Sequence, residues 1–284
     1  MPPSRPQQPK RRGDKSPRHA VTSYWDRTLW PIQSLYFLLP LVIGYELGTL
    51  WLAPAGGERL PPIYAESMLG RFFDWFGATG YYLPALAAVV VLGCQHVVSR
   101  DPWRPEPPLY LAMALESLVL AAPLFVFSLV MSRSTPAWSL ASMATELPLS
   151  NGFMAAATHG AGLEAVPSWS AGVVFSVGAG IYEELVFRLV AIALLHLFFD
   201  DFLALPKNWS AGLSIALSAV AFALYHPFDT YVFWQWSNAD WGRFTFYTLA
   251  GLYFAAIYQF RGFGIVAVTH ALYDVMVITA HFRG

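Results

Sequence analysis

The chain has 284 residues, of which 56% are hydrophobic and only 12% are charged, and its formal net charge is −1. Soluble globular proteins contain about 25% charged residues, so this chain lacks the polar side chains needed to cover a water-exposed surface. The composition predicts an integral membrane protein and excludes a disordered chain and a nucleic-acid-binding protein, which needs an excess of positive charge. The single cysteine, Cys94, excludes an internal disulfide and a cysteine-based zinc site.

The first 27 residues are predicted to form a disordered basic tail. Residues 1–20 contain six Lys or Arg residues and five prolines. Proline at this density prevents an amphipathic helix, and no apolar stretch follows closely enough to complete a cleavable signal peptide. We therefore favour a disordered cytoplasmic tail over an organelle transit peptide for residues 1–27, followed by a single membrane domain over residues 28–284.

Seven apolar segments follow the tail, each close to the length of about 20 residues that a membrane-spanning helix needs. They predict an all-α, polytopic transmembrane helical bundle with seven spans, or eight if the apolar segment Trp138–Ala157 also crosses. Between the first two spans, Ile63–Phe76 alternates bulky apolar and charged residues, as expected of a helix on the membrane surface. The seven spans are expected near Ile32–Ala53, Gly77–Val98, Leu109–Met131, Ala171–Leu197, Trp209–His226, Phe244–Phe260 and Gly262–His281.

The orientation follows from the distribution of Lys and Arg, which favour the cytoplasmic side of a membrane. With the tail inside, the predicted cytoplasmic segments contain eleven of these residues and the external segments contain five, and an eighth span leaves this ratio unchanged. The eleven are the seven up to Arg27, then Arg100, Arg104, Lys207 and Arg261. We therefore expect a cytoplasmic N-terminus, in the cytoplasmic membrane of a bacterium.

The fourth predicted span contains Glu183, Glu184 and Arg188. An ionisable residue at the centre of a membrane helix costs about 2.5–3.5 kcal/mol on insertion scales, so it usually faces a polar cavity or a partner. Residues four apart share a helix face, so Glu184 and Arg188 can pair, whereas Glu183 points about 100° away. Glu183 is therefore a candidate general base, and the preceding Gly178 and Gly180 would let a neighbouring helix approach closely.

Two later spans contain histidines with a partner at the same spacing. Phe222 and His226 lie four residues apart, and Pro227 ends that helix directly after the imidazole. In the last span, His270 and Asp274 share one helix face. A carboxylate and an imidazole can together activate a water molecule, while a second imidazole can donate to the oxyanion formed when a carbonyl is attacked.

Each polar residue also has a structural interpretation. A buried pair such as Glu184–Arg188 often only joins helices, so we assign these two residues to support instead of chemistry. Glu46 and Glu116 lie in early spans without a partner at helical spacing, and we interpret both as structural. Six ionisable residues at helical spacing in three late spans favour a functional site over a purely structural one.

Taken in order, the three patterns resemble the CPBP family of intramembrane proteases, also called the Abi family, which includes the type II CAAX prenyl endopeptidases. The resemblance covers roughly Ala171–His281, the motif-bearing core, and each motif lies on its own hydrophobic segment. The motifs are EExxxR (Glu183, Glu184, Arg188), FxxxH (Phe222, His226) and HxxxN/D (His270, Asp274).

The resemblance implies roles for these residues. Glu183 and His226 would activate the hydrolytic water, and His270 with Asp274 would support the oxyanion. The remaining three motif residues, Glu184, Arg188 and Phe222, would brace the site. The best-known CAAX members have asparagine at the position of Asp274. Because an ionised aspartate cannot donate a hydrogen bond to an oxyanion, Asp274 is either protonated or orients His270.

A zinc ion is an alternative to this mechanism. Glu183, His226 and His270 could form a two-histidine, one-carboxylate zinc site with an open position for water. The resemblance instead implies a glutamate-dependent mechanism without a metal, so we expect no cofactor and keep zinc as the alternative.

The function expected from the resemblance is an intramembrane endopeptidase. Its partners would be membrane lipids and membrane-anchored or lipidated peptide or protein substrates, because a buried site meets its substrate through the bilayer. Two other classes remain open. Acids and histidines at membrane depth also form the proton relays of proton-coupled transporters, and a non-catalytic immunity or binding protein could retain the same helical architecture.

Overall fold

The computed structural model describes residues 23–53, 60, 62–134, 168–226 and 232–283, and this part of the chain is all-α. The predicted tail up to residue 22 and the apolar segment Trp138–Ala157 lie outside the described residues. Within the described part, every predicted span overlaps a helical segment, and the span predicted from Gly77 becomes helical only at Leu83.

The described chain begins with a short helix, α1 (Tyr24–Thr28), which contains the last four residues of the predicted tail. Ser23 caps this helix. The Asp26 amide donates to Ser23 Oγ at 3.3 Å, and the Ser23 amide donates to the Asp26 carboxylate at 3.0 Å. Arg27 also pairs with Glu106. These contacts give the last residues of the predicted tail defined partners, and the domain boundary at residue 28 stays a prediction.

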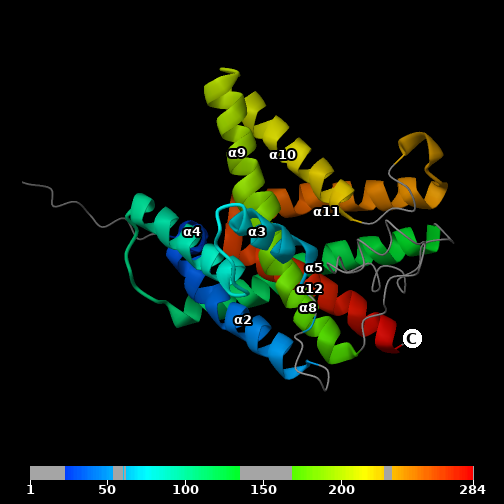
Figure 1. Cartoon of the computed structure of the whole chain (residues 1–284), viewed down its shortest axis with the longest axis horizontal. Helices are drawn as coiled ribbons and strands as arrows, with labels where there is room; N and C mark the ends of the chain where they lie inside the picture. Colours follow the sequence, from blue (N-terminus) through cyan, green and yellow to red (C-terminus); the bar gives the residue numbers. More distant parts are fainter. Residues whose placement is uncertain (1–22, 54–59, 61, 135–167, 227–231, 284) are drawn as a thin grey trace, which may run out of the picture.

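Long helices form the body of the molecule (Figure 1). The first three predicted spans correspond to α2 (Pro31–Trp51), α4 (Leu83–Ser99) and α5 (Pro107–Ser134). The expected surface helix is α3 (Tyr64–Asp74). The fourth span is one continuous helical stretch made of α8 (Trp169–Glu184), the π-helical η1 (Leu185–Ala191), α9 (Ile192–Leu197) and the π-helical η2 (Phe198–Phe202). The remaining elements are α10 (Lys207–Tyr225), the 3₁₀ turn η3 (Phe233–Gln235), α11 (Asn238–Arg261) and α12 (Phe263–Arg283).

The length and apolar character of these helices support an integral membrane protein. Among the described residues, four helices are long and apolar enough to cross a bilayer: α2, the first 26 residues of α5, α10 and α12. The helix α4 is apolar but has only 17 residues. The bundle is therefore all-α with four candidate spans, and the topology of seven or eight spans stays a prediction.

Helix α12 lies at the centre of the bundle, where it packs against α8, α5, α11 and α2 (Figure 1). It approaches α8 closely at Gly180, where an added Cβ would lie 2.4 Å from the carbonyl oxygen of Ala267 and 2.7 Å from the amide nitrogen of Ala271. Only glycine allows this distance between the two backbones. The crossing is one helical turn before Glu183 and Glu184, and it directs their side chains toward α12.

Helices α10 and α11 also cross at a small residue. An added Cβ at Gly251 would lie 2.9 Å from the Cα atom of Ala219. This contact brings the C-terminal half of α10, which includes Phe222, close to the centre of α11. Directly after Glu184, the chain changes from an α-helix to the π-helix η1. Such π-helical segments are frequent at functional sites.

Candidate active site

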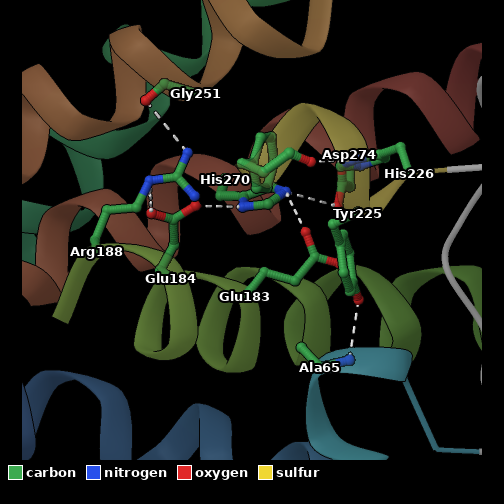
Figure 2. A network of polar contacts seen from close by, with 10 residues as sticks. Ala65, Glu183, Glu184, Arg188, Tyr225, His226, Gly251, His270 and Asp274 are labelled. Carbon is green, nitrogen blue, oxygen red and sulfur yellow. Dashed lines mark hydrogen bonds and ion pairs between the residues drawn. The ribbon is translucent and has the colours of Figure 1, made fainter. Parts of the chain in front are cut away.

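Glu184 and His270 form the closest contact between the predicted motifs. The Glu184 side chain extends from the end of α8, and its Oε1 atom lies 2.7 Å from Nδ1 of His270 on α12 (Figure 2). The His270 ring is also stacked on Phe254 of α11, with centroids 4.5 Å apart. Both motif residues are buried. Since Glu184 can accept at this distance, the contact sets the orientation of the imidazole.

Arg188 pairs with Glu184, as the spacing of four residues predicts, with Nε 3.0 Å from Oε2. The guanidinium group is completely buried and contacts two further helices. It donates to the carbonyl oxygen of Gly251 on α11 at 3.3 Å, and it lies over the ring of Phe222 on α10, 4.3 Å from the ring centre. Arg188 therefore joins three helices and compensates the charge of Glu184 inside the bundle.

Glu183 faces the other side of His270. Its Oε2 atom lies 3.8 Å from Nε2 of the imidazole, and its Oε1 atom accepts a 3.4 Å hydrogen bond from the hydroxyl of Tyr225 (Figure 2). The side chain is almost completely buried, and Oε2 receives no hydrogen bond within the described part of the chain. A buried carboxylate oxygen in this position can accept a hydrogen bond from a water molecule.

His226 caps the C-terminal end of α10 in an extended conformation, with φ −76° and ψ 153°. This backbone is expected for a residue before proline. Its Nδ1 atom lies 2.9 Å from the carbonyl oxygen of Phe222, and its ring is stacked on Tyr247 of α11 at a centroid distance of 3.7 Å. Because a carbonyl oxygen only accepts, Nδ1 bears the hydrogen, and Nε2 can accept a hydrogen bond when the ring is neutral.

Asp274 lies one turn after His270 on α12, with Oδ2 3.5 Å from Nε2 of the imidazole. It is the most accessible carboxylate of the group, with 13% of its side chain exposed. The imidazole of His270 is thus surrounded by three carboxyl groups, from Glu183, Glu184 and Asp274 (Figure 2). All seven residues expected from the motifs lie in one buried cluster formed by α8, η1, α10 and α12.

The described residues do not form a preassembled metal site. Within the residues that the structure describes, no group of three or more His, Cys, Asp or Glu side chains is arranged to bind a metal ion. One nitrogen of each histidine is already engaged, since Nδ1 of His226 contacts Phe222 and Nδ1 of His270 contacts Glu184. The two Nε2 atoms and Glu183 are the ligands that the zinc alternative would use, so zinc stays an alternative.

Three aromatic residues contact the cluster and were not expected from the motifs. Tyr225 hydrogen-bonds Glu183, Tyr247 stacks on His226, and Phe254 stacks on His270. In this aromatic-rich chain, no local spacing distinguishes them from aromatic side chains that face lipid. Only Tyr225, directly before His226, stands next to a motif residue in the sequence.

The comparisons with known proteins identify one similarity. Residues 165–276 match the family described as Type II CAAX prenyl endopeptidase Rce1-like. This range contains all seven motif residues, from Glu183 to Asp274. Comparison with curated proteins and with solved structures gave no match.

Proposed function

Residues 165–276 form a domain of the Rce1-like type II CAAX prenyl endopeptidase family, and from this premise we propose that the protein is an intramembrane endopeptidase. It hydrolyses peptide bonds of membrane-associated or lipidated substrates with a water molecule activated by Glu183 and His226. The observation that supports this best is the contact of His270 on α12 with both glutamates of α8, Glu184 at 2.7 Å and Glu183 at 3.8 Å.

In the proposed reaction, a water molecule lies between Oε2 of Glu183 and Nε2 of His226. Glu183 accepts one proton, and the lone pair of His226 accepts a hydrogen bond from the other, which directs the water oxygen at the scissile carbonyl carbon. The new C–O bond forms a tetrahedral oxyanion. The C–N bond then breaks, and the leaving nitrogen takes the proton from Glu183.

His270 stabilises the oxyanion in this proposal. A protonated imidazole donates from both nitrogens, so that Nδ1–H binds Glu184 while Nε2–H is directed toward the reacting carbonyl. Asp274 faces the same Nε2 atom at 3.5 Å, so it orients the ring instead of donating to the substrate. Arg188 and Phe222 brace Glu184 and His226.

The substrate reaches the site from the membrane. The motif residues other than Asp274 are buried in an integral membrane protein, and a lipidated or membrane-anchored peptide is already concentrated in the bilayer. We propose prenylated or otherwise anchored C-terminal peptides as the substrate class, which is consistent with the matched family.

Cleavage by the protein reconstituted in liposomes tests the proposal, with a prenylated CAAX peptide and a transmembrane peptide library as substrates. Glu183→Gln and His226→Ala are each expected to lower turnover by about 10²–10⁴-fold, the usual contribution of general acid–base catalysis. His196→Ala, in α9, is the matched control and is expected to retain activity. Unchanged turnover in both motif variants would contradict the assignment.

The same preparation separates the alternatives. Full activity after chelator treatment, in a sample without bound zinc, would leave a metal-free mechanism; loss of activity that zinc restores would identify a zinc enzyme. Substrate flux without cleavage would identify a transporter. A cellular function that survives substitution of Glu183 and His226 would identify a non-catalytic binding protein.

A further inference from the structure

Tyr225 connects the surface helix α3 to the catalytic cluster. Its hydroxyl group accepts a 2.9 Å hydrogen bond from the backbone amide of Ala65, in the first turn of α3, and contacts Oε1 of Glu183 at 3.4 Å (Figure 2). Ala65 is 160 residues away in the sequence. The amides in the first turn of a helix have no acceptor within the helix, so Tyr225 satisfies one of them in α3.

The direction of these hydrogen bonds is determined by the chemistry of the three groups. A backbone amide can only donate, so it occupies a lone pair of the tyrosine oxygen. A phenol hydroxyl has one proton, and this proton then remains for the carboxylate oxygen of Glu183. The Ala65 amide therefore directs the Tyr225 hydroxyl as a donor toward Oε1, and Oε2 is left to face His270 and the reacting water.

Packing restricts the ring of Tyr225 to this position. The side chain is 7% exposed. It contacts Phe187 of η1 edge to face, with centroids 5.2 Å apart, and lies against Tyr64 of α3 at 5.4 Å. A buried aromatic side chain with two neighbouring rings has little freedom to rotate, so the hydroxyl group has a defined location.

We propose that Tyr225 is a positioning residue that orients the carboxylate of Glu183 and links it to α3. The inference rests on the proposed function, in which Glu183 is the general base. The 3.4 Å distance is long for a hydrogen bond between two oxygens, and catalytic hydrogen bonds of this kind commonly shorten when substrate binds. Since α3 is the helix expected at the membrane surface, the contact ties the geometry of the base to the placement of that helix.

Tyr225→Phe removes only the hydroxyl group and keeps the ring. With the prenylated peptide as substrate, kcat is expected to fall about 10- to 100-fold, because a displaced catalytic group costs rate, while KM stays within about twofold. Tyr110→Phe is the matched control. The Tyr110 hydroxyl also accepts a hydrogen bond from a backbone amide, that of Glu106 at 3.0 Å, and donates one to the side-chain oxygen of Gln33 at 2.8 Å. Tyr110 belongs to α5 and does not contact the site.

A measurement that needs no turnover separates this inference from the proposed function. The infrared carboxyl band of Glu183, assigned by its loss in Glu183→Gln, is expected to shift in Tyr225→Phe and not in Tyr110→Phe. A shifted band in a protein without protease activity would support the contact and contradict the proposed function. An unshifted band, an unchanged kcat, or an equal loss in Tyr110→Phe would overturn the positioning role.

Discussion

At the scale of single residues, the site depends on how the positive charge of Arg188 is compensated within the bundle. The guanidinium group is completely buried and lies beside Glu184, the ring of Phe222 and the carbonyl oxygen of Gly251. An uncompensated charge in this environment would cost several kcal/mol, whereas these three contacts make the pair tolerable, although Nη1 has no hydrogen-bond partner among the described residues. Glu184 forms the ion pair with Arg188 and also orients His270, so the two interactions are coupled.

Arg188→Met tests this compensation. The substitution leaves the carboxylate of Glu184 buried without its cation, and we expect it to lower the free energy of unfolding by about 3–5 kcal/mol. Arg27→Met removes the cation of an ion pair whose side chains are 31% and 29% exposed, and it should cost about 0–1 kcal/mol. Thermal unfolding in detergent measures both. Equal losses of unfolding free energy in the two variants would show that the buried ion pair contributes no more to stability than the exposed one.

At the scale of helices, the crossing of α8 and α12 determines where the polar residues meet. The two backbones touch at Gly180, and the motif residues follow on the next turn of α8. A side chain at this crossing would separate the helices and lengthen the contact between Glu184 and His270. The glycine thus contributes to the geometry of the site although it lacks a side chain.

Gly180→Ala is expected to destabilise the protein by about 1–3 kcal/mol, the usual cost of overpacking a core. It should also lower cleavage activity. Gly212→Ala is the control, because an added Cβ at this position in α10 meets nothing within 4 Å. In a helix interior that change should instead add about 0.5–1 kcal/mol of stability. Unfolding and cleavage assays on both variants measure these changes. A Gly180→Ala protein that is as stable and active as the original would contradict the argument from close packing.

At the scale of the whole molecule, three segments predicted to be cytoplasmic meet at one end of the bundle. Arg27 pairs with Glu106, Gln33 donates to the carbonyl oxygen of Arg104 at 2.9 Å, and the guanidinium of Arg261 lies 3.9 Å from the ring centre of Trp25. The junction between α11 and α12 reaches this end through Gly262, whose φ of +83° favours glycine. Segments on the same side of a membrane must lie at the same end of the bundle, as these three do. That this side is the cytoplasmic one stays a prediction.

Cysteine labelling tests that side. In a Cys94→Ser background, Asp101→Cys, in the α4–α5 connection, is expected to react with an impermeant maleimide only after the cells are permeabilised. Ala78→Cys, between α3 and α4, should react in intact cells, because a membrane helix separates the two positions. The opposite pattern would reverse the orientation derived from Lys and Arg.

The contacts within single helices could be predicted from the sequence. Spacing alone indicates that Glu184 reaches Arg188 and that His270 and Asp274 share a face, and these side chains lie 3.0 and 3.5 Å apart. The contacts between helices could not be predicted. Glu116, which we interpreted as structural and without a partner at helical spacing, binds Arg261 of α11 at 2.7 Å, 145 residues away. No local period indicates such a partner.

Hydrophobicity and helical period are local properties, so the membrane character, the approximate positions of the helices and the motif residues could all be predicted from the amino-acid sequence. The folded arrangement was needed to find that Glu184, assigned to support, lies closer to His270 than Glu183 does, and that Tyr225 joins Glu183 to α3. Those distances depend on where helices cross, and a crossing is determined by the packing of residues far apart in the chain.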